Sequence, residues 1–179
     1  RDNGNYALGT EAVTLAERLS AAGYRTAAFV SAAVLARRYG LDQGFATYDD
    51  DLWSEDEPDL FMIRDRPAER TAARTVDWLE RWQAHDADQP FFVWMHLYDP
   101  HAPYDPPEPY RTRFAGRPYD GEIAFADAQL GRVLDALRRA GRQDDTVVAV
   151  LGDHGEALGE HGEATHAILG RPLGARHVR

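Results

Sequence analysis

The hydrophobic positions of this chain follow two patterns that alternate along the sequence. Three segments carry apolar residues at the three- and four-residue spacing of an amphipathic helix, and three others are short, continuous apolar runs of strand length. The helical segments are 10–22, 67–82 and 122–140, and the apolar runs are 24–30, 91–97 and 147–151. This alternation predicts an α/β fold with a largely parallel sheet flanked by helices.

Residues that favour helix ends lie beside the helical segments. Thr10 is a suitable N-cap for the first helix, and Gly23 and Gly141 follow the first and third helices at positions where glycine commonly ends a helix. Trp78 and Trp82 fall at helical spacing in the second helix. We expect both tryptophans to pack in the core or in an interface.

The last two apolar runs and the helix between them form a predicted βαβ unit. Strand 91–97 is apolar except for His96, so we expect a central strand buried on both faces, with His96 as a hydrogen-bonded core residue. A helical crossover predicts parallel strands and a right-handed connection. Both strands then end at the same edge of the sheet, where α/β proteins place their active sites.

A stiff loop follows strand 91–97. Prolines at positions 100, 103, 106, 107 and 109 fix φ at several points of this loop. His101 lies in it, just beyond the carboxyl end of the predicted strand, so its imidazole is held with little loss of entropy on binding a ligand. We expect His101 to be a functional residue.

Acids, histidines and glycines crowd the positions after strand 147–151. Asp153 and His154 come first, where the chain leaves the sheet and both side chains can turn towards one point. A carboxylate with an imidazole suits a divalent cation, and this mixed ligation fits Zn²⁺ or Mn²⁺ at least as well as Ca²⁺. For the dipeptide alone, the alternative is a hydrogen-bonded pair that stabilises a turn. The residues that follow, GE at 155–156 and GEHG at 159–162, make the pattern more specific and favour the metal site.

Composition and charge exclude several classes of protein. The 179 residues are enough for one domain with a core. Lys+Arg 20 against Asp+Glu 30 gives a net charge of −10, which argues against a broad nucleic-acid-binding surface. No apolar run approaches the roughly 18 residues of a transmembrane helix, and the chain has no cysteine for a nucleophile or a thiolate ligand. The acidic stretch 49–59 is expected to be a solvated surface loop.

Three motifs resemble those of the sulfatases of the alkaline-phosphatase-like superfamily. They are GDHGE at 152–156 with GEHG at 159–162, DPHAPY at 99–104, and YDGEI at 119–123, where the third helix opens. The resemblance runs from about residue 10 to residue 166. It implies an alkaline-phosphatase-like fold and a hydrolase that cleaves sulfate esters of small molecules or glycans with the help of a divalent metal cation.

The resemblance also implies roles for individual residues. Asp153 and His154 would be metal ligands for Ca²⁺, Mg²⁺, Mn²⁺ or Zn²⁺, and many sulfatases have Asn where this chain has His154. His101 would contact the transferred group or protonate the leaving oxygen. His161 and His166 would contact the substrate or lie around the site, and His166 is also a candidate ligand for a second ion.

Both ends of the chain depart from the family pattern. The family nucleophile, a formylglycine made from Cys in a C-x-P-S-R motif, and the first metal-binding acids would lie upstream of Arg1. The basic segment 167–179 does not follow the pattern either. We therefore expect one partial domain over 1–179, incomplete at both ends and with an atypical tail at 167–179, that turns over little substrate by itself.

Two other functions stay open at this point. A Ser or Thr nucleophile would indicate a phosphoester hydrolase or a phosphoglycerol transferase on the same fold. A non-catalytic remnant, in which the Asp153–His154 pair is structural, is the third interpretation. Relatives are often periplasmic, secreted or membrane-tethered, which favours an extracytoplasmic location.

Overall fold

The computed structural model describes residues 6–52, 65–156 and 158. The chain divides at Thr146 into two compact units, of which the first holds residues 3–146 and the second residues 147–179. The expectation of a single partial domain with a tail at 167–179 stays a prediction, and the tail lies outside the described residues.

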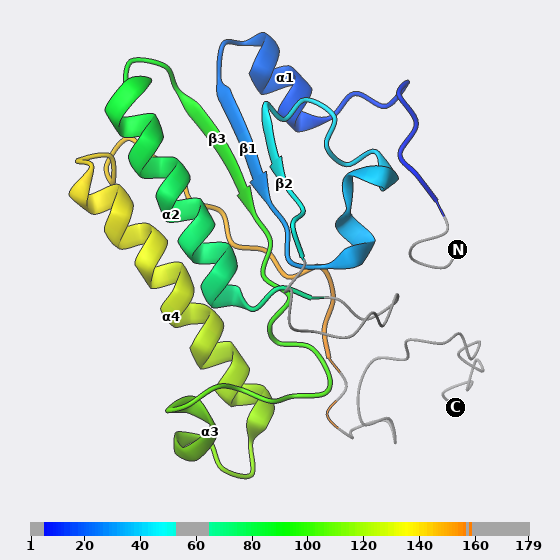
Figure 1. Ribbon diagram of the computed structural model, residues 1–179, viewed down its shortest axis with the longest axis vertical. Helices are drawn as coiled ribbons and strands as arrows, with labels where there is room; N and C mark the ends of the chain where they lie inside the picture. The colour runs from blue at the N-terminus through cyan, green and yellow to red at the C-terminus, as the bar shows by residue number, and fades with distance from the viewer. Residues whose placement is uncertain (1–5, 53–64, 157, 159–179) are drawn as a thin grey trace, which may run out of the picture. The chain divides into compact units, whose positions relative to one another are not determined.

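A parallel sheet of three strands forms the centre of the first unit (Figure 1). The strands are β1 (Arg25–Phe29), β2 (Thr47–Asp49) and β3 (Phe91–Met95), and their order is β2-β1-β3. Ala27 is in register with Thr47 of β2 and with Val93 of β3. The prediction of a parallel sheet flanked by helices is confirmed.

In the described part of the chain, four α-helices and two short 3-10 helices connect and cover the strands. They are α1 (Leu15–Ala21), η1 (Ala33–Leu35), η2 (Arg37–Tyr39), α2 (Ala68–His85), α3 (Tyr110–Arg113) and α4 (Pro118–Arg139). Helix α1 begins later than predicted because Thr14, not Thr10, forms a capping box with Glu17. Helix α4 begins earlier than residue 122 because Pro118 is well suited to a first helical turn.

Helices α2 and α4 run beside each other and cover one face of the sheet (Figure 1). Their apolar side chains pack against Ala27 and Phe29 of β1. The small side chain of Ala27 allows the helices to pack close to the sheet. Trp82 packs edge-on against Phe91, with 4.6 Å between ring centroids. The prediction that Trp78 and Trp82 lie in the core is confirmed. This cluster comprises Ala27, Phe29, Ala72, Trp78, Leu79, Trp82, Val133 and Leu137.

The other face of the sheet carries a smaller apolar cluster. Ala28, Val30 and Tyr48 are buried there, and residues of the η1–β2 segment and of β3 pack against them. Phe45 stacks on Trp94 with 6.1 Å between ring centroids. Both faces of β1 are therefore covered, which makes β1 the central strand of the described sheet.

Two predictions about strands were wrong. Strand β3 is not a central strand buried on both faces, because among the described residues it pairs only with β1 and its five residues are half-buried. Residues 147–151 form no strand in the second unit, and Val147 and Leu151 are 96% and 90% exposed. An apolar run becomes a strand only when a neighbour pairs with it, and the described residues supply none. The predicted βαβ unit of 91–97 and 147–151 stays a prediction, because the two segments belong to different units.

Candidate active site

The carboxyl end of the sheet is held by a chain of buried hydroxyl groups. Ser31, just after β1, donates from Oγ to the carbonyl of His96, just after β3, at 2.5 Å. Because a carbonyl only accepts, the Thr71 hydroxyl must donate to Ser31 Oγ, 2.8 Å away. The Ser31 amide donates to His96 Nδ1 at 3.4 Å. His96 is thus hydrogen-bonded, as predicted, but it is half-buried just after β3 and is not a core residue.

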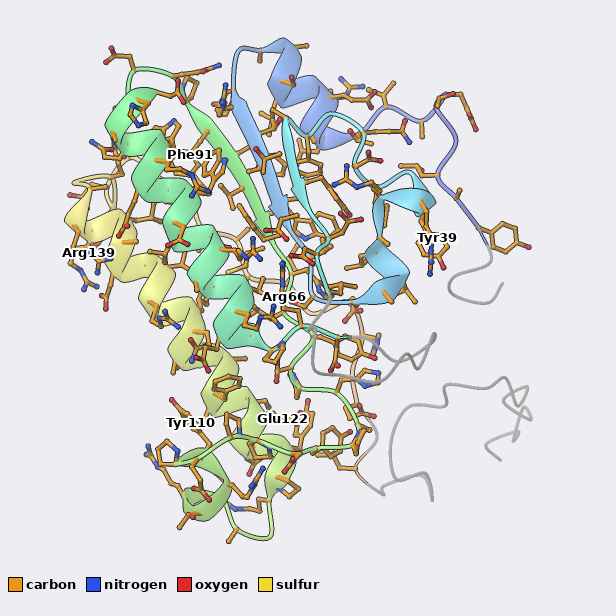
Figure 2. All side chains as sticks on the ribbon, viewed as in Figure 1. Tyr39, Arg66, Phe91, Tyr110, Glu122 and Arg139 are labelled. Carbon is orange, nitrogen blue, oxygen red and sulfur yellow. The ribbon has the colours of Figure 1, made fainter. Side chains whose placement is uncertain are left out.

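The buried arginine Arg66 ties this end of the sheet together (Figure 2). Its side chain is 0% exposed and pairs with Asp49 of β2, with 2.6 Å between Nη1 and Oδ1. Nη2 donates to the carbonyl of Val30 at 2.8 Å, and Nε donates to Thr71 Oγ1 at 3.0 Å. One guanidinium therefore joins β1, β2 and α2 at the edge where the candidate catalytic loop begins.

The acidic stretch 49–59 is only partly the solvated loop that was expected. Asp49 pairs with Arg66, and Asp50 pairs with Arg37 at 2.9 Å. Burial alone would raise the pKa of Asp50, but hydrogen bonds from Arg37 outweigh it and hold that pKa below its usual value. The first acids of this stretch are therefore structural ion-pair partners, and residues 53–59 lie outside the described residues.

The imidazole of His101 is fixed at both nitrogens. Nδ1 lies 2.7 Å from the carbonyl of Ala102 and must donate to it, which leaves Nε2 of the neutral ring as an acceptor. The Tyr98 hydroxyl lies 2.9 Å from Nε2, and the two rings stack with 4.1 Å between centroids. Burial, with a contribution from the charge of Asp65, raises the pKa of Tyr98 to about 12, so its hydroxyl keeps the proton that it donates.

Two carboxylates, one half-buried and one buried, hold the backbone of the same loop. Asp99 accepts a hydrogen bond at 2.9 Å from the amide of Ala68, the first residue of α2. Glu122 of α4 accepts from the amides of His101 and Asp105 at 3.0 and 2.7 Å. Burial raises the pKa of both carboxyl groups above the usual value, although these hydrogen bonds act in the opposite direction.

Tyr98 and Glu122 were not identified as site residues from the sequence. For Glu122 a signal existed, because positions 122, 125, 129, 133 and 136 continue one buried face of α4 at helical spacing. A carboxylate on a face that is mostly apolar needs a polar partner. Which partner it has could not be read from the spacing.

In the second unit, Asp153 and His154 are exposed neighbours that approach each other. His154 Nε2 lies 3.6 Å from Asp153 Oδ2, and the His154 amide donates to Asp153 Oδ1 at 3.0 Å. The carbonyl of Gly155 lies 2.8 Å from His154 Nδ1 and must accept from it, so Nε2 carries the lone pair of the neutral ring. This arrangement offers one carboxylate oxygen and one imidazole nitrogen on the same side.

The described residues contain no group of three or more side chains that could hold a metal ion. His161 and His166, the predicted substrate contacts, lie outside them. His101 belongs to the first unit and the Asp153–His154 pair to the second, so their predicted convergence at one sheet edge stays a prediction. Among the described helices, none is both long enough and apolar enough to cross a membrane.

Comparisons with known proteins agree with this fold. The arylsulfatase of Clostridium perfringens (strain 13 / Type A) is 25% identical over 135 residues, which cover 53% of this chain and 27% of that protein. The iduronate 2-sulfatase of Mus musculus is 40% identical over 62 residues, or 34% of this chain and 11% of that protein. The solved structure of the lipoteichoic acid synthase LtaP from Listeria monocytogenes matches with a TM-score of 0.55 at 21% identity, covering 80% of this chain and 36% of that one.

The chain spans only a part of the length of these relatives, about a quarter or less of the two sulfatases. The sequence model of the family described as Sulfatase, by contrast, matches residues 3–174 of this chain. That match extends over nearly the whole sequence, and the parallel sheet with its helices has the architecture of the structural relatives. The chain therefore belongs to the sulfatase family, which has the alkaline-phosphatase-like fold.

Proposed function

We propose that this chain is part of a metal-dependent hydrolase that cleaves sulfate esters, with His101 as the general acid. Membership of the sulfatase family and the similarity to an arylsulfatase and an iduronate 2-sulfatase support the sulfate ester as substrate. The observation that carries the proposal is the imidazole of His101, held at both nitrogens in the loop after β3. An imidazole whose Nδ1–H is held by a carbonyl gains and loses its second proton at Nε2, which suits it to a single proton transfer there.

The role of His101 follows from the bonds that change. A nucleophile attacks the sulfur, and the bond between sulfur and the ester oxygen breaks. His101 starts this step as an imidazolium, with Nδ1–H on the carbonyl of Ala102 and a second proton on Nε2. The departing oxygen gains negative charge and takes the Nε2 proton, which leaves the ring neutral with Nδ1–H still on Ala102. Tyr98 stacks on the ring and keeps its plane fixed. Once Nε2 has lost its proton, the Tyr98 hydroxyl donates a hydrogen bond to it.

Asp153 and His154 would supply part of the metal's ligand shell. Their donor set, one carboxylate and one imidazole within 3.6 Å of each other, fits a divalent cation, and the hydrogen bond from Nδ1 to Gly155 orients Nε2 as the ligating nitrogen. Family members generally use a divalent metal, which when bound polarises the ester and favours ionisation of the nucleophile. The chain contains no cysteine, so a cysteine-derived nucleophile would come from residues outside it.

A second candidate is a phosphoester hydrolase or a phosphoglycerol transferase. The likeness in fold to the lipoteichoic acid synthase LtaP favours it. Sulfate and phosphate esters present the same tetrahedral group to His101 and differ mainly in charge, so the same site residues serve both reactions. The choice between them rests on the substrate that the protein turns over.

Hydrolysis of two chromogenic esters by the full-length gene product separates these functions. We expect 4-nitrophenyl sulfate to be hydrolysed faster than 4-nitrophenyl phosphate, and EDTA to abolish the reaction. His101→Ala should lower kcat by about 10²- to 10⁴-fold, as expected for the loss of a general acid. His85→Ala is the matched control, because His85 is an exposed histidine at the end of α2 and should leave kcat unchanged. A preference for the phosphate ester would favour the second candidate. If neither ester is turned over with Ca²⁺, Mg²⁺, Mn²⁺ or Zn²⁺, the result would support a non-catalytic remnant.

A further inference from the structure

The loop that carries His101 is held to α4 at one side chain. Glu122 Oε2 accepts from the amide of His101 at 3.0 Å, and Oε1 accepts from the amide of Asp105 at 2.7 Å. Each carboxylate oxygen therefore satisfies one backbone donor, and the two donors lie on either side of a short loop segment. Without this carboxylate both amides would lose their acceptor.

Glu122 is itself fixed in place (Figure 2). Its residue is 5% exposed and lies in the first part of the 22-residue helix α4, a rigid support. The preceding Gly121 leaves no space between helix and loop, because a Cβ at that position would lie 2.8 Å from Cγ of Pro106 and 3.3 Å from Cβ of Phe114. The loop therefore rests directly on the helix at the residue before Glu122.

The buried charge of Glu122 is unfavourable for folding. Burial, together with the charges of Asp99 and Asp105, raises its pKa, and the two amide hydrogen bonds offset only part of this. An uncharged residue of the same shape would avoid this cost. A carboxylate whose charge is disfavoured by burial, and which binds the backbone of a candidate catalytic histidine, points to a functional constraint.

We propose that Glu122 is a positioning residue, which fixes the main chain of His101 so that the imidazole, bound to Ala102 and Tyr98, is presented in one orientation. The proposal rests on the function proposed above, because it assigns to His101 the proton transfer. The chain of contacts runs from α4 through the Glu122 carboxylate to the His101 amide, and from there to the ring. Glu122 touches neither the substrate nor the metal in this scheme.

Amide hydrogen exchange in this chain tests the contact without requiring activity. Glu122→Gln keeps the shape but replaces one acceptor oxygen by an NH₂ group, so at least one of the amides of His101 and Asp105 should exchange about tenfold faster or more. The amide of Val30, in the core, should exchange at the wild-type rate. Asp120→Asn is the matched control. Asp120 lies two residues before Glu122 and forms an exposed ion pair with Arg117, so the loss of its charge should change the exchange rate of neither amide.

Catalysis in the full-length gene product tests positioning. Glu122→Gln should lower kcat by about 10- to 100-fold with little change in KM, and Asp120→Asn should change neither. Glu122→Asp, which keeps the charge but is one methylene shorter, should restore one amide contact and part of kcat. Unchanged exchange, equally faster exchange at Val30, or an unchanged kcat would each overturn the proposal. If the wild type hydrolyses neither ester, the proposed function fails, and the exchange rates alone decide whether Glu122 holds the loop.

Discussion

Buried polar side chains at the carboxyl end of the sheet are satisfied by partners that are distant in sequence. Arg66 reaches Asp49 and Val30, which lie 17 and 36 residues away, and Ser31 reaches His96 across 65 residues. These contacts fix the positions at which the strands end. A single unsatisfied group among them would cost about 1–3 kcal/mol, and more if it is charged.

Removing Arg66 should therefore destabilise the fold severely. Arg66→Met keeps much of the volume but leaves the Asp49 carboxylate without its buried partner, and we expect a loss of about 3–5 kcal/mol in the free energy of unfolding. Arg74 is the matched control, because its exposed guanidinium lies 3.6 Å from the other oxygen of Asp49. Arg74→Met should cost less than about 1 kcal/mol. Urea unfolding followed by circular dichroism measures both, and similar small losses would contradict the role given to Arg66.

The sequence indicates which residues could be functional but not which partners hold them. His101 stands out because prolines surround it, and Asp153 and His154 because they follow an apolar run. Tyr98 and Glu122 were missed since their importance lies in tertiary contacts that no local pattern reports. Arg66 was missed for the same reason, because an isolated arginine before a helix reads as a surface residue until its burial is known.

For the secondary-structure elements, hydrophobic periodicity predicted where the helices lie better than it predicted which of their side chains are buried. The helical spacing of 122–140 corresponds to most of α4, and the apolar residues that follow this spacing form a stripe that includes Ile123 and Leu137. In the structure Leu137 is buried against α2 and the sheet, whereas Ile123 is 44% exposed. The stripe is therefore wider than the face that α2 covers.

Two alanine substitutions on α4 test this difference. Leu137→Ala removes a core side chain and should lower the free energy of unfolding by about 2–5 kcal/mol. Ile123→Ala deletes an equally large side chain from the same helix, but from its exposed side, and should cost less than about 1 kcal/mol. Thermal and urea unfolding of the two variants provide the comparison. Equal losses would mean that Ile123 is covered in the protein in solution.

Strand pairing is the step at which sequence reasoning failed. Residues 24–30 and 91–97 were predicted as strands and contain β1 and β3, because each finds a neighbour in the described sheet. Residues 147–151 have the same apolar character and form no strand. An apolar composition indicates that a segment tends to be buried, whereas strand formation also needs a partner elsewhere in the chain. A single apolar run therefore cannot show whether it will pair as a strand.

Across the chain as a whole, the two apolar clusters described for the first unit include no residue of 147–151. The buried residues of both apolar clusters lie between Ala27 and Leu137. Half of the predicted site, His101, belongs to this unit, and the other half, Asp153 and His154, belongs to the second. The stability of the first unit and the assembly of the full site are therefore separate questions, and the first can be tested alone.

Leu151→Asp distinguishes the structure from the sequence-based expectation. In the structure this side chain is exposed, so a carboxylate there should change the free energy of unfolding by no more than about 0.5 kcal/mol. Val30→Asp provides the contrast. Val30 directly follows β1 and is fully buried, so an unpaired carboxylate at that position should prevent folding or cost several kcal/mol of the free energy of unfolding. If Leu151→Asp proves as damaging as Val30→Asp, then residues 147–151 form the buried strand that their composition predicts. The Asp153–His154 pair would then follow directly from the end of a sheet strand, as the predicted metal site requires.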